Sequence, residues 1–172
     1  MRRSTSAMVW LVIFAVLAAV AHLMRPPARV PGAPVTGSAR VVDGDSLDIA
    51  GVRIRLQGID APEREQSCRN PDGRSYSCGR EAARALAAAV AGRSVTCTPV
   101  EVDQYNRDVA LCTADGADVG ETMVRSGHAL DYARHSRGRY AAAEREAREA
   151  RRGVWAGEFE RPAMWRQQNA TR

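Results

Sequence analysis

The sequence predicts an α+β fold that is mainly β, with five antiparallel strands and three α-helices. Three observations lead to this prediction. Five short runs are rich in Val, Ile and Thr or alternate apolar with polar residues, as strands do. Three other runs repeat apolar residues at intervals of three or four, which is typical of amphipathic helices. Along the chain the runs follow the order three strands, one helix, two strands and two helices.

Residues 1–24 precede the domain and carry an export signal. Two arginines are followed by an apolar run over residues 7–24, with an Ala-Val-Ala cleavage pattern inside it. The run is 18 residues long, which is also the lower limit for a membrane-spanning helix. A cleaved signal peptide and an N-terminal membrane anchor therefore both remain open. Either would be a hydrophobic helix that exports the rest of the chain, which is then periplasmic, secreted or tethered to the membrane through residues 7–24 alone.

The domain is expected over residues 38–157, after a Pro/Gly-rich linker at residues 25–37. Asp-Gly and Ala-Gly turn signals divide its first part into three strands, expected at Ala39–Val42, Ser46–Ile49 and Val52–Gln57. A helix is expected over Gly79–Ala91, where apolar residues recur at a spacing of four until Gly92.

The second half of the domain begins with two strands, expected at Ser94–Val102 and Arg107–Thr113 around a four-residue turn. Asp118 with Glu121 forms a variant of the capping box and predicts a short helix. The longest helix is expected over Ser136–Arg152, and residues 158–172 are expected to be a weakly ordered tail. Five antiparallel strands with a helix after the third predict an OB-fold barrel.

Charge and cysteine content narrow the functional class. The formal net charge is +5, and all 25 basic residues are arginines, whose planar forks suit phosphate groups on a polyanion. The four cysteines include no C-x-x-C pair, so a thiolate zinc site is not indicated. An even number of cysteines in an exported chain predicts two disulfides. We expect them to join Cys68 to Cys78 and Cys97 to Cys112.

Acidic residues cluster where two predicted strands end. Asp43 and Asp45 follow the first strand, and Asp60 follows the third. Carboxylates brought together from different strand ends, with backbone carbonyls such as that of Ala61, can bind a hard cation. Asp45 and Asp60 are the expected direct ligands, and Asp43 is expected to hold the turn.

A possible general base and three arginines accompany the acidic cluster. Glu63 follows a proline that fixes its backbone direction, so it can position or deprotonate a water. Arg53 and Arg55 share one face of their strand, and periodicity does not choose between them. Arg107 opens the last strand and can reach the same cleft. Because a phosphorane is more negative than a diester, two arginines and a cation would stabilise it preferentially. The pattern predicts metal-dependent phosphoryl transfer.

Three stretches in this region resemble the signature motifs of the staphylococcal nuclease (thermonuclease) family. They are Val-Val-Asp-Gly-Asp-Ser at residues 41–46, Arg-Leu-Gln-Gly-Ile-Asp-Ala-Pro-Glu at 55–63 and Asp-Gln-Tyr-Asn-Arg at 103–107. The likeness continues through residues 124–127 and 153–155, and so covers about residues 38–157.

The resemblance implies roles for six residues. The family's calcium ligands fall on Asp45, Asp60 and the main-chain carbonyl of Ala61. Its phosphate-binding arginines fall on Arg55 and Arg107, and its catalytic glutamate falls on Glu63. These assignments imply a Ca²⁺-dependent nuclease that cleaves the 5′ P–O bond of DNA and RNA and leaves 3′-phosphate ends. They also favour Arg55 over Arg53. The chain departs from the staphylococcal enzyme at Ala61, where that enzyme has Thr.

Two other functional classes remain as alternatives. A catalytically inactive OB-fold module could bind nucleic acid or protein without cutting, but grouped acidic residues would repel a polyanion. An exported Ca²⁺-binding domain with a structural role would leave the arginines unexplained. DNA and RNA are the expected substrates, no protein partner is implied, and a monomer is expected.

Overall fold

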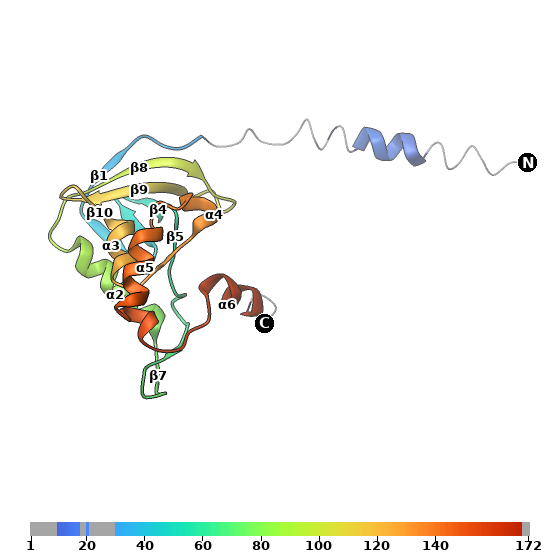
Figure 1. The fold of residues 1–172 in the computed structure, drawn as a ribbon. Helices are drawn as coiled ribbons and strands as arrows, with labels where there is room; N and C mark the ends of the chain where they lie inside the picture. Colours follow the sequence, from blue (N-terminus) through green and yellow to red (C-terminus); the bar gives the residue numbers. More distant parts are fainter. Residues whose placement is uncertain (1–9, 18–19, 21–29, 170–172) are drawn as a thin grey trace, which may run out of the picture.

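A curled sheet forms one side of the domain, helices α2 (Cys78–Val90) and α3 (Val119–Arg125) lie against it, and α5 (Ala141–Glu149) packs on α3 (Figure 1). This computed structural model describes residues 10–17, 20 and 30–169. Within them the large sheet has seven strands in the order β1-β8-β9-β4-β3-β2, with β10 paired to β9. These strands are β1 (Val35–Gly37), β2 (Ala39–Val41), β3 (Ser46–Ile49), β4 (Val52–Leu56), β8 (Val95–Val102), β9 (Asp108–Ala114) and β10 (Ala117–Asp118). The result is a mixed α+β architecture consistent with an OB-like fold.

The pairing of β4 with β9 corrects the expectation of a wholly antiparallel sheet. These two strands run parallel, with Ile54 opposite Asp108 and Leu56 opposite Ala110. Parallel neighbours need a long crossover connection, and here that connection contains α2 (Cys78–Val90) and β8. The two hairpins β3–β4 and β8–β9 are antiparallel as predicted, and the parallel contact joins them.

The five predicted strands correspond to β2, β3, β4, β8 and β9, with ends that differ by at most one residue. The small strands were not predicted. They are β1, β10, the pair β5 (Ile59–Asp60) with β11 (Leu130–Asp131), and the pair β6 (Cys68–Arg69) with β7 (Ser75–Tyr76). Strand β1 (Val35–Gly37) falls within the segment expected to be linker and pairs with β8.

Two helices follow the prediction and a third does not. The first helix is α2, and α3 (Val119–Arg125) is capped by Asp118, whose Oδ1 accepts the backbone N–H of Glu121. The long helix predicted over Ser136–Arg152 is instead α4 (Ala133–Ser136) and α5 (Ala141–Glu149). Arg137 and Gly138 between them both have positive φ angles, which end one helix before the next begins.

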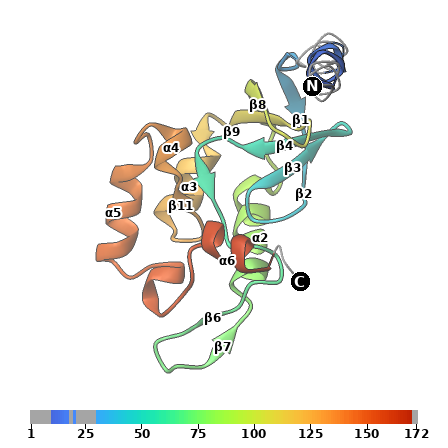
Figure 2. The same cartoon turned by 90° about the vertical axis from the view of Figure 1, so that its right-hand side faces the viewer.

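The C-terminal part also differs from the expectation of a weakly ordered tail. After the 3₁₀ helix η1 (Gly153–Ala156), the chain pairs with Arg69 through Glu158 and forms α6 (Pro162–Asn169). Figure 2 shows α6 lying beside the chain that leads from β5 toward α2. Side-chain contacts of Arg166 with Asp60 and Glu63 hold α6 there. The spacing of apolar residues in this short segment does not predict such contacts.

The N-terminal prediction lies mostly outside the described residues. Residues 10–17 are helical, and among the described residues no helix is long and apolar enough to cross a membrane. The signal peptide or anchor therefore stays a prediction, as do the predicted domain boundaries.

The core lies between the concave side of the sheet and the helices. Its largest buried side chains come from β3, β4, β5, α2, α3 and the residue before α5, and they are Leu47, Ile49, Ile54, Leu56, Ile59, Leu86, Met123 and Tyr140. The two predicted disulfides are present. Cys97–Cys112 joins β8 to β9 inside this core. Cys68–Cys78 fastens β6 to the first residue of α2, and so limits the loop that follows Glu63.

Candidate active site

Two buried carboxylates lie at the ends of neighbouring elements. Asp45 precedes β3 and Asp60 ends β5, and they are 5% and 4% exposed. The Asp45 turn is held as expected, because Asp43 Oδ1 accepts the backbone N–H of Asp45 at 3.1 Å. A Cβ at Gly44 would lie 2.7 Å from the Cβ of Ala61, so only glycine lets this turn approach the residue after Asp60.

Arg55 lies between these two carboxylates. Its Nη1 donates to Asp45 Oδ1 at 3.0 Å, while its Nη2 is 2.9 Å from Asp45 Oδ2 and 3.6 Å from Asp60 Oδ1. Such forked contact is the geometry that guanidinium and carboxylate groups favour. Arg53 lies 3.7 Å from Asp48 instead. The structure therefore brings Arg55, and not Arg53, to the acidic cluster.

The pKa of Asp45 reflects the burial and the charges of this cluster. It is raised to about 7, first because the carboxyl group is buried; the Arg55 charge acts to lower it, and the charges of Asp43, Asp60 and Glu63 act to raise it. Four carboxylates thus interact, and two of them, Asp45 and Asp60, are buried. A bound cation would relieve this repulsion.

Replacing Asp45 with Asn is expected to stabilise the cation-free protein at pH 8. The unfolded Asp45 has a pKa near 3.9, so the folded chain binds more protons between about pH 4 and 7 and loses stability as pH rises through that window. Asn does not ionise and avoids this loss. We expect a gain on the order of 2 kcal/mol at pH 8, or about 4–8 °C in melting temperature, and none near pH 4.

Thermal melts in chelator at both pH values measure this effect. Asp48→Asn is the matched control, since Asp48 is a nearby carboxylate that pairs with Arg40 at 2.9 Å on the surface. It should give no gain at pH 8. Equal melting temperatures for Asp45→Asn and the unchanged protein at pH 8 would contradict the electrostatic account.

Glu63 is held firmly by its backbone. Its N–H donates to Oε1 of Gln66 at 3.1 Å, and its carbonyl accepts the N–H of Gln66 at 2.7 Å. Gln66 is fully buried. A Cβ at Gly79 would lie 1.8 Å from the Glu63 carbonyl oxygen, so the first turn of α2 is packed directly against this backbone. The Glu63 side chain itself remains 32% exposed and can reach a ligand in the cleft.

Arg107 reaches the cleft from the turn before β9. Its Nε lies 2.7 Å from Asp103 Oδ2, and its guanidinium lies over the Tyr105 ring at 5.4 Å. Burial acts to raise the pKa of Asp103, but hydrogen bonds from Arg107 and Tyr105 and the Arg107 charge leave it below its usual value. A charged Asp103 therefore orients a charged Arg107. Within the described part of the chain, Arg107 forms no ion pair with the acidic cluster of Asp43, Asp45, Asp60 and Glu63.

A cleft of about 950 Å³ unites most of these side chains. Asp45, Arg55, Glu63 and Arg107 line it, so four of the six predicted site residues share one cavity. Asp60 and Ala61 are buried and are not among the residues that line it. Tyr132 and His135 also line the cleft, with ring centroids 4.7 Å apart.

Arg166 is a residue of this cleft that the sequence did not reveal. It comes from α6, and its Nη1 lies 2.9 Å from Asp60 Oδ1 and 2.6 Å from Glu63 Oε1. Arg166 lies in a segment without a motif or a strong periodicity, and the chain has 25 basic residues. Nothing in the sequence therefore marks this arginine as a site residue. Only the tertiary position of α6 reveals the contact.

The donor set fits a hard cation. Within the described residues, no three His, Cys, Asp or Glu side chains gather into a ready-made metal cluster. Asp45 and Asp60 nevertheless offer two buried carboxylates, and burial, followed by the charges of neighbouring carboxylates, raises the pKa of Asp45. Hard cations commonly complete such a set with backbone carbonyls and water. Asp45, Asp60 and the carbonyl of Ala61 are the residues that could hold one.

The matches to known proteins cover the part of the chain that forms this cleft. Residues 53–157 match the sequence model of a family described as "Staphylococcal nuclease homologue". The chain is 40% identical over 129 residues to the succinoglycan biosynthesis protein ExoI of Rhizobium meliloti (strain 1021), covering 74% of this chain and 68% of that protein. It is 34% identical over 134 residues to an uncharacterized endonuclease of Escherichia coli O157:H7, covering 74% and 81%.

A plant relative is matched over a smaller part of its length. The chain is 37% identical over 122 residues to the probable staphylococcal-like nuclease CAN3 of Oryza sativa subsp. japonica. The match covers 69% of this chain but 30% of the plant protein. The aligned part is therefore one region of that longer protein.

Proposed function

The chain belongs to the staphylococcal nuclease family, and on that premise we propose that it is a Ca²⁺-dependent nuclease that hydrolyses phosphodiester bonds of DNA and RNA. One observation carries the proposal. Two buried carboxylates, a glutamate and two arginines from separate parts of the chain meet at one cleft. Relatives named as nucleases support the same reaction class.

Glu63 acts as the general base in this proposal. It takes a proton from a water that attacks phosphorus, and the bond from phosphorus to the 5′ oxygen breaks. The 5′ oxygen leaves and takes a proton from solvent, so that the products carry a 3′-phosphate and a 5′-hydroxyl. The firmly held backbone of Glu63 favours this role, since a base must stay within hydrogen-bond reach of the water.

Arg55 and Arg107 stabilise the negative charge that grows on the phosphorane. Both line the cleft, and each is oriented by a carboxylate: Arg55 by Asp45 and Arg107 by Asp103. Donors already in place act more strongly on the transition state than on the substrate. Asp45, Asp60 and the Ala61 carbonyl would hold Ca²⁺, which when bound supplies a positive charge beside the reacting phosphate.

Cleavage of DNA and RNA by the purified protein tests the proposal directly. We expect cleavage that rises with added Ca²⁺, loss of about two orders of magnitude or more in chelator, and recovery when Ca²⁺ is restored. End-group analysis should find 3′-phosphates. Cleavage that persists in chelator would contradict the cation mechanism. Binding of nucleic acid without cleavage at any Ca²⁺ concentration would favour a catalytically inactive binding module instead.

The proposal includes the cellular compartment in which the protein acts. We infer an exported protein, periplasmic, secreted or tethered by its N-terminal segment. Two disulfides among four cysteines support an oxidising environment, because thiols are kept reduced in the cytosol.

A further inference from the structure

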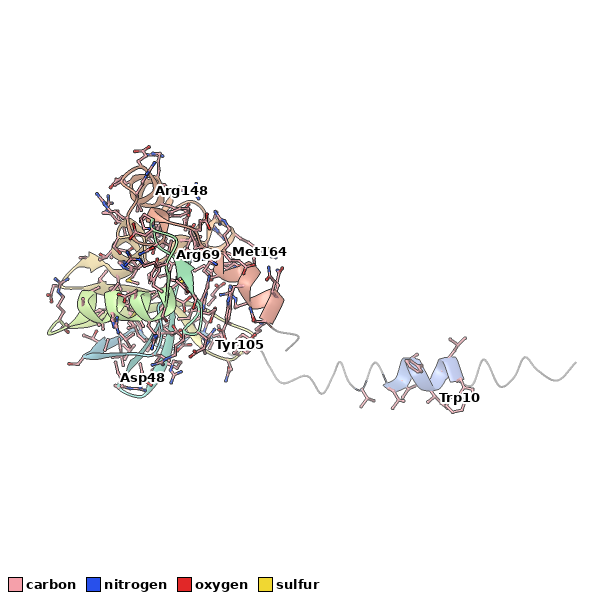
Figure 3. All side chains as sticks on the ribbon, turned by 90° about the horizontal axis from the view of Figure 1, so that it is seen from below. Trp10, Asp48, Arg69, Tyr105, Arg148 and Met164 are labelled. Carbon is pink, nitrogen blue, oxygen red and sulfur yellow. A yellow bond between two sulfur atoms is a disulfide. The ribbon has the colours of Figure 1, made fainter. Side chains whose placement is uncertain are left out.

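Helix α6 lies beyond the region that matches the family model, which ends at residue 157. It nevertheless supplies a side chain to the centre of the cleft. In Figure 3 Met164 on α6 lies on the same side of the domain as Tyr105, which adjoins Arg107. The side chain of Arg166 is 36% exposed, and its guanidinium touches both a carboxylate assigned to the cation and the one assigned to the base.

We propose that Arg166 is an internal counter-cation, which occupies Asp60 and Glu63 in the cation-free protein and competes with the divalent cation for them. This inference rests on the function proposed above. Asp60 Oδ1 already accepts a hydrogen bond from Arg166 at 2.9 Å, and Nη2 of Arg55 lies 3.6 Å from the same oxygen. A divalent cation at this oxygen would lie close to the positive charges of both Arg166 and Arg55, and this repulsion is strongly unfavourable away from water.

The same contact keeps Glu63 from acting as a base. Its Oε1 accepts a hydrogen bond from Arg166 at 2.6 Å. While Arg166 donates to this oxygen, a water cannot approach the oxygen from the same side. Glu63 can therefore accept a water at this oxygen only when Arg166 withdraws, and a cation that displaces Arg166 from Asp60 would free Glu63 in the same event.

The attachment of α6 permits this withdrawal. The segment before it is anchored, since Glu158 pairs with Arg69 and the Glu160 carbonyl accepts the Gln66 side-chain N–H at 2.7 Å. The helix itself buries little: Pro162 is its only buried residue in the described range, and Met164 is 48% exposed. The helix can thus swing about residue 160 with a small loss of apolar contact, while the anchored segment stays in place.

Calorimetric titration of the full chain with Ca²⁺ alone tests the competition without any catalysis. Arg166→Ala is expected to bind Ca²⁺ roughly tenfold more tightly than the unchanged protein, a size typical of coupling between two ligands. Arg161→Ala is the matched control, because it removes the same charge from an exposed position directly before α6. It should change affinity less than twofold. Unchanged or weaker Ca²⁺ binding by a folded Arg166→Ala variant would overturn the inference.

Asp45→Asn separates this inference from the proposed function. If Asp45→Asn binds Ca²⁺ as well as the unchanged protein, the cation site is misplaced and both proposals fail. If Asp45→Asn loses Ca²⁺ binding while Arg166→Ala keeps the original affinity, the cation site stands and only the competition fails.

Trypsin gives a second measurement of the helix itself. Arg161 precedes a proline and resists cleavage, so cleavage after Arg166 reports the exposure of this one side chain. We expect Ca²⁺ to speed that cleavage several-fold in the unchanged protein and to leave it unaltered in Asp45→Asn. Cleavage that Ca²⁺ does not speed, in a protein shown to bind Ca²⁺, would also overturn the inference.

Discussion

Replacing Glu63 with Gln is expected to lower the turnover of nucleic acid by about 10²–10⁴-fold, the range that a positioned general base contributes. Gln keeps the size and hydrogen-bonding ability of the side chain but does not accept a proton from water. The fold should change little. The side chain is 32% exposed, its backbone contacts with Gln66 are untouched, and the lost ion pair with Arg166 is of a kind worth about 0–1 kcal/mol.

Single-turnover kinetics at saturating Ca²⁺ measure this loss without the influence of product release. Glu65→Gln is the control, since Glu65 is an exposed carboxylate two residues along the same loop. It should retain turnover within about twofold, in line with ordinary surface substitutions. Turnover near that of the unchanged protein in Glu63→Gln would remove Glu63 from the reaction, and another group would then have to accept the proton.

Replacing Arg107 with Ala is expected to lower turnover by about 10²–10³-fold, as the loss of one fixed donor to a developing anion does. Arg107 is oriented before any substrate arrives, by Asp103 on one side and the Tyr105 ring on another. It therefore loses little freedom when charge builds up on phosphorus. Affinity for uncleaved nucleic acid should fall much less, because the diester carries less charge than the phosphorane.

The split between turnover and binding decides the role of Arg107. Turnover and the dissociation constant for a DNA strand held in chelator give the two quantities separately. Arg93→Ala serves as the control, since Arg93 faces Asp115 at 3.7 Å on the surface. Arg107→Lys should recover only part of the rate, because Lys keeps the charge but not the fork. A loss confined to binding would make Arg107 a substrate-binding group only.

The hairpin that carries most of the site could be read from the sequence because its signals are local. Turn dipeptides set the ends of β2, β3 and β4, and the register that places Ser46 opposite Arg55 follows from them. That register brings Arg55 next to Asp45. The resemblance to a known family was still needed to choose Arg55 over Arg53, because strand periodicity places both on one face of β4. Only their tertiary contacts distinguish them: Arg53 pairs with Asp48 and Arg55 with Asp45.

The missed features depend on contacts between distant parts of the chain. The break between α4 and α5 uses two residues at positive φ, Arg137 at 54° and Gly138 at 81°. Gly138 is a helix-stop signal that the prediction passed over, whereas the residue type of Arg137 does not indicate its conformation. Helix α6 is placed by Arg166, whose partners precede it by about a hundred residues. Helical periodicity records which face of a helix is apolar, so it gives little information on a helix fixed mainly by one ion-paired side chain.

The parallel contact between β4 and β9 has a consequence for the order in which the protein folds. Each hairpin, β3–β4 and β8–β9, joins residues close in the sequence and can form on a time scale of about 1–10 μs. The contact of Arg55 with Val109 must close a loop that contains α2, so it should form later. The cleft spans this junction, with Arg55 on one hairpin and Arg107 on the other. If the proposed function holds, a chain that has formed both hairpins but not this contact should be unable to cut nucleic acid.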